Sequence, residues 1–175
     1  MKSRPVGSII GAVGGLLFVL LNASAVPLTP VWWVLAVAGF AGVIWFTVLH
    51  GPIVTQQPPP RAAIRTYGLA VLAMVLAIVV GARVLGFIDR PNAVVPWVVL
   101  AVGAHFLPFA GAFGLPIFRL LAISLIAVAV VGGIATLLHD SATSAGWTGV
   151  LAGFVLLLFA AFGPALSKGA GARAA

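Results

Sequence analysis

Long apolar stretches separated by short polar segments dominate the chain. Stretches without any Asp, Glu, Lys or Arg run over 5–60, 66–82, 91–118, 120–139 and 141–167. Their residues are apolar on every face, whereas strands of membrane barrels alternate between apolar and polar. About 20 apolar residues in a helix cross a hydrocarbon layer of ~30 Å. Six membrane helices are therefore predicted, over 6–24, 30–50, 63–87, 94–112, 116–139 and 146–166.

Turn-forming residues separate these helices. Gly51-Pro52 and the run 56–60 (Gln-Gln-Pro-Pro-Pro) end the second helix and form an extended loop, and the remaining links are short. The predicted fold is all-α, a polytopic bundle of six transmembrane helices in one integral membrane domain, 1–175. The N-terminal stretch up to Ala23-Ser24-Ala25 also resembles a secretory signal peptide, whose removal would leave five spans; retention is the preferred interpretation.

Composition agrees with lipid as the solvent. The chain is 63% hydrophobic and 6% charged, whereas soluble domains carry about 25% charged residues. The net charge of +7 does not indicate nucleic-acid binding, because the nine cations are scattered and form no basic cluster. The absence of cysteine excludes disulfides and thiolate metal sites. No cofactor is predicted.

The positive charges are unevenly distributed between the two predicted sides. Seven of the nine cations lie on the side of the termini: Lys2, Arg4, Arg61, Arg65, Arg119, Lys168 and Arg173. Both acids, Asp89 and Asp140, lie on the other side with Arg83 and Arg90. The positive-inside rule then places both termini in the cytoplasm and the protein in the plasma (inner) membrane. Arg61 and Arg65 are expected to contact anionic lipid headgroups.

Short residue patterns recur along the chain and predict an internal repeat. Val79-Val80-Gly81 matches Val130-Val131-Gly132, and Asp89 and Asp140 follow these triplets at the same offset. The even-numbered helices each begin near a tryptophan and stop near a Gly and a Pro, the last of them at Gly163-Pro164. We therefore predict three repeated helical hairpins, against the alternative that apolar sequences align by chance.

Glycines four residues apart mark one face of the first helix and one of the last. They are Gly7, Gly11 and Gly15 in the first helix, and Gly149 and Gly153 in the sixth. Glycine at this spacing lets two helix backbones approach closely. The faces either form the seam of a homo-oligomer or pack against each other inside one subunit, and the second arrangement is preferred.

His105 is the strongest candidate for a solute or proton site. It lies near the middle of the fourth helix, where ionisable residues are costly and usually face the bundle interior. Pro108 follows it and is expected to kink the helix by removing the donor to Ala104 O. The alternative is a histidine that only fixes packing, bonded to Ser124, Thr47 or a backbone carbonyl.

Charged residues at the outer end form the second candidate group. Arg83 is expected either to extend to the membrane interface or to pair with Asp89 or Asp140 as an outer gate or anion site. His50 and His139 are expected at helix ends. No His, Asp or Glu set has the spacing of a metal site, and two acids at the surface give little support for an enzyme.

The run 103–110 (Gly-Ala-His-Phe-Leu-Pro-Phe-Ala) resembles a segment of small, uncharacterised multi-pass bacterial membrane proteins. It covers under a tenth of the chain, and no activity comes with it. The leading functional hypothesis is a permease or channel-like protein for a small, weakly polar or apolar solute, with a pathway near His105. The alternative is a non-catalytic membrane scaffold or accessory subunit acting through its glycine faces, and a lipid-processing enzyme ranks third.

Overall fold

The computed structural model describes residues 2–3, 6–47, 54–55 and 61–171. Within these ranges the chain is almost entirely helical, apart from short turns and a two-residue antiparallel pairing of β1 with β2. The elements in chain order are β1 (Lys2–Ser3), α1 (Val6–Asn22), η1 (Ala23–Ala25), α2 (Thr29–Trp45), β2 (Val54–Thr55), α3 (Arg61–Phe87), η3 (Pro91–Ala93), α4 (Val94–His105), α5 (Leu107–Ala112), α6 (Ile117–His139) and α7 (Ala142–Gly171). The predicted all-α fold is confirmed.

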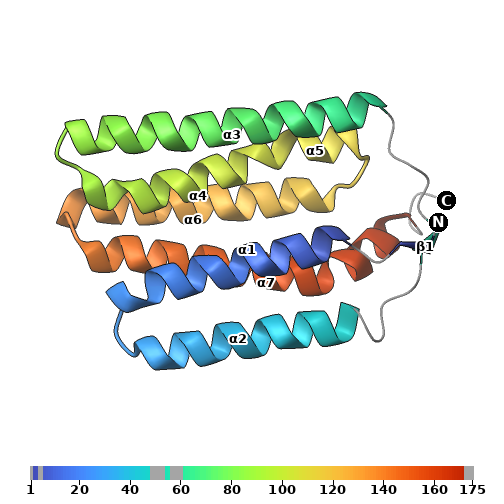
Figure 1. The fold of residues 1–175 in the computed structure, drawn as a ribbon, viewed down its shortest axis with the longest axis horizontal. Coiled ribbons are helices and arrows are strands. Elements are labelled where there is room, and N and C mark those ends of the chain that lie inside the picture. Colours follow the sequence, from blue (N-terminus) through green and yellow to red (C-terminus); the bar gives the residue numbers. More distant parts are fainter. Residues whose placement is uncertain (1, 4–5, 48–53, 56–60, 172–175) are drawn as a thin grey trace.

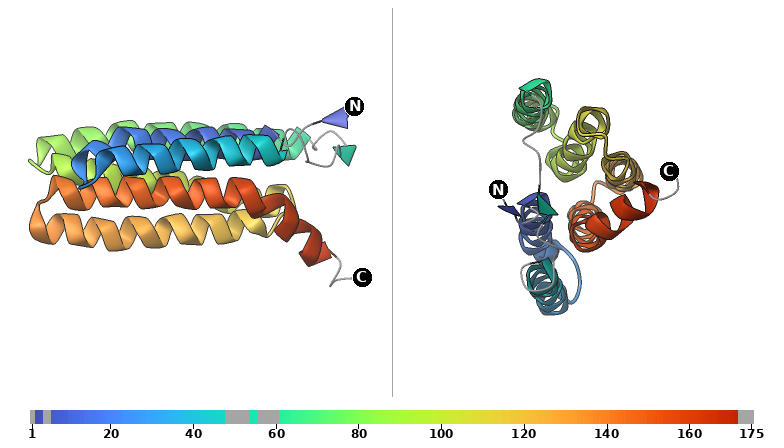
Figure 2. Two further views of the ribbon diagram at one scale, coloured as in Figure 1. Left: turned by 90° about the horizontal axis from the view of Figure 1, so that it is seen from below. Right: turned by 90° about the vertical axis from the view of Figure 1, so that its right-hand side faces the viewer.

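The long helices lie side by side, with the start of α1 and the end of α7 at the same end of the bundle (Figure 1). Helices α4, α6 and α7 pack against one another, and α1 packs along α7. Helix α2 lies against α1 and α7, while α3 lies against α4 and α5, so that α2 and α3 occupy the two outer positions (Figure 2). The predicted bundle of six helices is confirmed, with its fourth member divided into α4 and α5.

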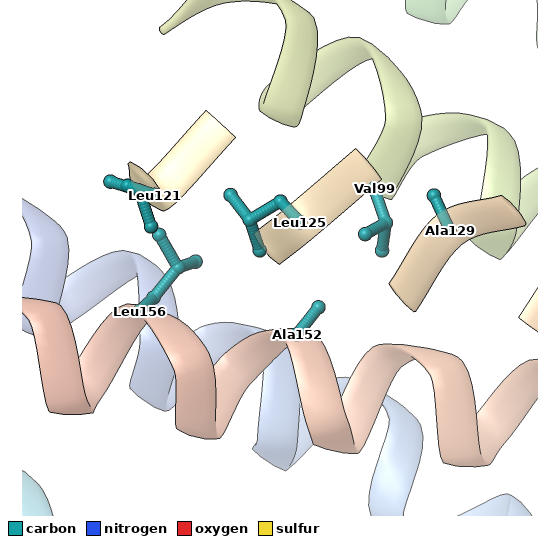
Figure 3. Close-up of a cluster of buried hydrophobic side chains, with 6 residues drawn as sticks. All are labelled: Val99, Leu121, Leu125, Ala129, Ala152 and Leu156. Atoms are coloured by element: carbon teal, nitrogen blue, oxygen red, sulfur yellow. The ribbon is translucent and has the colours of Figure 1, made fainter. Parts of the chain in front are cut away.

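Aliphatic side chains from three helices fill the centre of the bundle (Figure 3). The largest buried cluster draws on α4, α6 and α7 and comprises Val99, Leu121, Leu125, Ala129, Ala152 and Leu156. Val99 and Leu125 have no exposed surface. Packing of this kind supplies dispersion contacts, which hold helices together where lipid offers no hydrophobic driving force.

Glycines bring α1 and α7 into backbone contact. A Cβ built on Gly15 would lie 2.6 Å from Gly153 O, and one built on Gly153 would lie 2.6 Å from Gly15 O. Gly11 faces the Cβ of Ala160. The glycine faces of the first and last helices therefore pack against each other within one chain. Gly149 lies against the Asn22 side chain on the same helix pair, whereas Gly7 has no such neighbour within 4 Å.

The outer surfaces of the helices are apolar, as a bilayer requires. Five helical segments are long and apolar enough to cross a membrane: Gly7–Ala25, Arg61–Phe87, Pro91–Ala112, Ile117–His139 and Ala142–Phe162. The 17 residues of α2 span about 25 Å and fall at the lower end of the usual range. The most apolar window of α3 is 0% buried, and its exposed residues include Leu72 and Val79. The chain is a multi-pass helical membrane protein.

Two predicted helix boundaries differ from the structure. The last helix does not stop at Gly163-Pro164: α7 continues to Gly171, and its ribbon bends near that end (Figure 2). A proline inside a helix removes one hydrogen bond and bends the helix, but the helix can resume beyond it. The fourth predicted helix, 94–112, is broken at Phe106. The predicted end of the second helix and the loop 56–60 lie outside the described residues.

Candidate functional site

A break in the fourth membrane segment is the main irregularity near the predicted site. Pro108 has no N–H to donate to Ala104 O, so the helix loses one hydrogen bond at this point. The N–H of Phe106 donates to Gly103 O (3.2 Å) instead of to Val102 O, its acceptor in a continuous helix. Val102 O receives its hydrogen bond from the imidazole of His105, at 2.5 Å. The side chain thus satisfies a carbonyl that the break would leave unpaired.

This hydrogen bond defines the tautomer of His105. A carbonyl oxygen can only accept, so Nδ1 carries the hydrogen, and Nε2 of a neutral ring is then an acceptor. The side chain is neither buried nor fully exposed. His105 therefore serves the fold through Nδ1 and keeps Nε2 as the ring atom that can receive a hydrogen bond from a solute.

Aromatic rings surround the imidazole. The ring centroids of Phe106 and Phe109 lie 4.1 and 5.2 Å from that of His105. Tyr67 of α3 stacks on Phe109 at 5.3 Å, and further rings extend the cluster toward the end of the bundle near the termini. This cluster was not predicted, although Phe106, Phe109 and Phe113 have the three- and four-residue spacing of one helix face.

The two hydroxyls named as partners of His105 are not joined to its imidazole by the described hydrogen bonds. Ser124 is half-buried, and its Oγ donates to Leu120 O (2.9 Å) within α6. Thr47 is buried and follows the end of α2, a helix that packs on α1 and α7. Of the partners proposed for His105, the one found in the structure is a backbone carbonyl, that of Val102.

A polar cluster joins two turns at the opposite end of the bundle. Arg90 Nη1 lies 3.7 Å from Asp140 Oδ2. The amide of Asn92 donates to Asp140 O (3.2 Å) and to its Oδ1 (3.3 Å). We call Arg90, Asn92 and Asp140 the outer polar cluster. The predicted partner of Asp140 was Arg83, but the described ion pair is formed by Arg90. The turn 89–92 is polar at three of its four positions, and this pattern could have indicated a polar cluster there.

The two aspartates themselves have turn-forming backbones. Asp89 and Asp140 both adopt positive φ values, of 56° and 43°. Asp tolerates this left-handed conformation better than most residues, because its short side chain can hydrogen-bond locally. Arg83 is exposed on α3, about one turn before the end of that helix. Arg83, Asp89 and Asp140 therefore lie at one end of the bundle, but of these three candidates only Asp140 takes part in the described ion pair with Arg90.

An apolar hollow of about 210 Å³ lies next to the outer polar cluster, between α3, α4 and α6. Its lining residues share an aliphatic or small character, with one indole: Leu85, Ala93, Pro96, Trp97, Leu100, Ala129, Gly133 and Leu137. The indole N–H of Trp97 donates to Ala77 O (2.8 Å), which fixes the ring against α3. Trp97 therefore links α4 to α3, a role that its position near the start of a predicted helix did not indicate.

Within the described residues, no three His, Cys, Asp or Glu side chains come close enough together to hold a metal ion. Those residues also contain no buried side-chain nitrogen or oxygen without a hydrogen-bond partner. No family model matches the chain, and no curated protein or solved structure is significantly similar to it.

Proposed function

We propose that the protein is a small permease or channel-like membrane protein whose solute passes the break between α4 and α5. The observation that carries the proposal is the interrupted helix at His105, whose Nδ1 is engaged by Val102 O. Broken membrane helices form the solute sites of many transporters, because non-helical backbone at that depth lines a binding site or cavity. The imidazole Nε2 is the polar atom that such a solute would meet.

The surroundings of His105 favour an uncharged solute. Phe106, Phe109 and Tyr67 supply aromatic surface around the imidazole. The described ion pair, between Arg90 and Asp140, lies at the far end of the bundle. Its charges therefore cannot stabilise a charged solute at the break. A charged solute would therefore lose its hydration without gaining a partner. A small apolar or weakly polar molecule with one hydrogen-bond donor fits this environment.

The accessory-subunit hypothesis has less support. It relied on free glycine faces that would bind a partner. Gly11, Gly15 and Gly153 instead contact the opposite helix of the same chain, and a partner helix could not reach them without separating α1 from α7.

Replacing His105 with alanine is expected to lower solute permeation about tenfold, the equivalent of one hydrogen bond of roughly 1.4 kcal/mol. Stopped-flow light scattering of proteoliposomes under gradients of small uncharged solutes measures this permeation without labels. Ser124→Ala is the matched control, because it removes a membrane hydroxyl that hydrogen-bonds within its own helix. Permeation equal to that of empty liposomes, or unchanged in a folded His105→Ala protein, would contradict the proposal.

We also propose that both termini are cytoplasmic. The start of α1 and the end of α7 share one end of the bundle, and so do Arg61, Arg65 and Arg119. The acids lie at the other end with Arg90. This distribution is the one that the positive-inside rule associates with a cytoplasmic end.

Single cysteines test this orientation cleanly, because the chain has none of its own. Ile88→Cys and Ala62→Cys place exposed thiols at opposite ends of α3. In intact cells, a membrane-impermeant maleimide is expected to label Ile88→Cys and to leave Ala62→Cys unlabelled until the cells are lysed. The reverse pattern would place the termini outside.

A further inference from the structure

The hollow between α3, α4 and α6 is a built feature rather than a packing defect. Small residues create it, since Gly133 has no side chain and Ala93 and Ala129 have only a methyl group. Its wall is held in place by the hydrogen bond from Trp97 Nε1 to Ala77 O. Apolar cavities of roughly 150 Å³ stay dry and take up benzene-sized ligands, so this volume of about 210 Å³ accommodates several methylene groups.

The hollow faces the bilayer. Helices α3 and α6 both pack on α4, which forms the floor between them. Leu137, on the rim, is 54% exposed. An unfilled apolar surface here would forfeit dispersion contacts, and in a membrane the nearest apolar matter is a lipid acyl chain.

The outer polar cluster sits at one end of this hollow. Asn92 directly precedes the lining residue Ala93, and Asp140 follows Leu137 by one helical turn. Arg90 and Asp140 are 46% and 56% exposed and 3.7 Å apart, so both charges are accessible and their mutual attraction is weak. One cation and one anion therefore lie side by side where an apolar groove meets the membrane interface.

We propose that this hollow and the outer polar cluster together bind one zwitterionic phospholipid with a primary ammonium headgroup. An acyl chain lies along Trp97, Leu100 and Leu137. The phosphate accepts hydrogen bonds from the Arg90 guanidinium, whose planar fork matches phosphate oxygens. The ammonium donates to the carboxylate of Asp140. This inference is independent of the proposed solute pathway, because it uses the opposite end of the bundle.

The charge pattern distinguishes this lipid from the alternatives. A choline headgroup has no N–H to donate to Asp140, and its methyl groups keep the positive charge farther from the carboxylate. An anionic glycerol headgroup offers the same phosphate to Arg90 but has no cation to pair with Asp140, so the Asp140 carboxylate would lie unpaired beside a lipid of net negative charge, which is unfavourable. Only a primary ammonium completes both halves of the pair.

Native mass spectrometry of the detergent-purified protein, with dioleoyl phosphatidylethanolamine, phosphatidylcholine and phosphatidylglycerol as probes, tests the headgroup. We expect one molecule of the ethanolamine lipid to bind about tenfold more tightly than either of the others. Asp140→Asn and Arg90→Gln should each abolish the preference. Asparagine also tolerates the left-handed backbone at position 140, so that variant keeps the turn. Equal binding of the three lipids, or a preference for the glycerol lipid, would overturn the proposal.

Two neighbouring tryptophan substitutions test the acyl chain. Leu137→Trp covers the hollow from its exposed rim and is expected to reduce binding of the ethanolamine lipid about tenfold. Leu138→Trp is the matched control, because Leu138 is 75% exposed and does not line the hollow. Unfolding temperatures of the lipid-free proteins identify any variant that is misfolded. A folded Leu137→Trp protein that binds as wild type would overturn the assignment of the hollow.

Discussion

Replacing Gly15 with alanine is expected to destabilise the whole bundle by about 1–3 kcal/mol, the usual cost of overpacking a well-packed interior. The new methyl group would lie 2.6 Å from Gly153 O and 3.0 Å from the backbone nitrogen of Leu157. Both are backbone atoms, which cannot rotate away as the end of a side chain can. Relief requires α1 and α7 to separate, and these two helices share the most extensive contact in the bundle.

Gly14→Ala on the same helix is the matched control. Its nearest neighbour would be the end of the Leu156 side chain at 3.9 Å, an ordinary contact. Because alanine favours a helix by about 1 kcal/mol over glycine, this variant should be neutral or slightly more stable. Thermal unfolding in detergent, followed by circular dichroism, compares the two. Equal unfolding temperatures would show that the α1–α7 interface is not closed by Gly15 and Gly153.

The order and number of the helices could be predicted because they depend on one physical requirement. A hydrocarbon layer requires about 20 apolar residues per crossing, and runs of that length are visible in the sequence because charged and turn-forming residues concentrate near their ends. The effect of a proline inside an apolar run could not be predicted in the same way. Pro108 and Pro164 both sit inside apolar helices, yet one interrupts its segment and the other does not. At Pro108 the imidazole of His105 provides the hydrogen bond to Val102 O, a contact that the sequence alone could not show.

The partners of individual side chains could not be predicted in the same way. Helices that are apolar all round do not reveal which face meets another helix. Trp97 illustrates this: tryptophan at a helix start is typical of the membrane interface, but its indole reaches α3 because position 81 is glycine. The outer polar cluster likewise joins Arg90 and Asp140, which lie 50 residues apart and meet only once the bundle has formed.

The two glycines that align in the predicted repeat, Gly81 and Gly132, have similar surroundings in the structure. The same separation, 51 residues, relates Gly81 to Gly132, Trp97 to Thr148, and Asp89 to Asp140. A Cβ at Gly81 would overlap the indole of Trp97, and a Cβ at Gly132 would overlap the side chain of Thr148. Each glycine thus receives a side chain from the first turns of the next membrane segment. The repeat stays a prediction, but it now predicts that both glycines are equally intolerant of substitution.

Gly81→Ala and Gly132→Ala are each expected to lower the unfolding temperature by several degrees, since overpacking costs about 1–3 kcal/mol. Gly86→Ala on α3, where a Cβ would meet nothing within 4 Å, is the control. Thermal unfolding in detergent again supplies the measurement. A tolerated Gly132→Ala alongside a damaging Gly81→Ala would contradict the equivalence of the two positions.

Second substitutions separate steric overlap from other effects of the methyl group. The three atoms nearest a Cβ at position 81 all belong to the Trp97 ring, so adding Trp97→Ala should remove the overlap, and the two changes should be strongly non-additive. At position 132 the Cβ of Thr148 itself would lie at 2.8 Å, so adding Thr148→Ala should restore only part of the stability. Additive effects in the first pair would show that Gly81 is needed for the α3 backbone itself, and not to admit the indole.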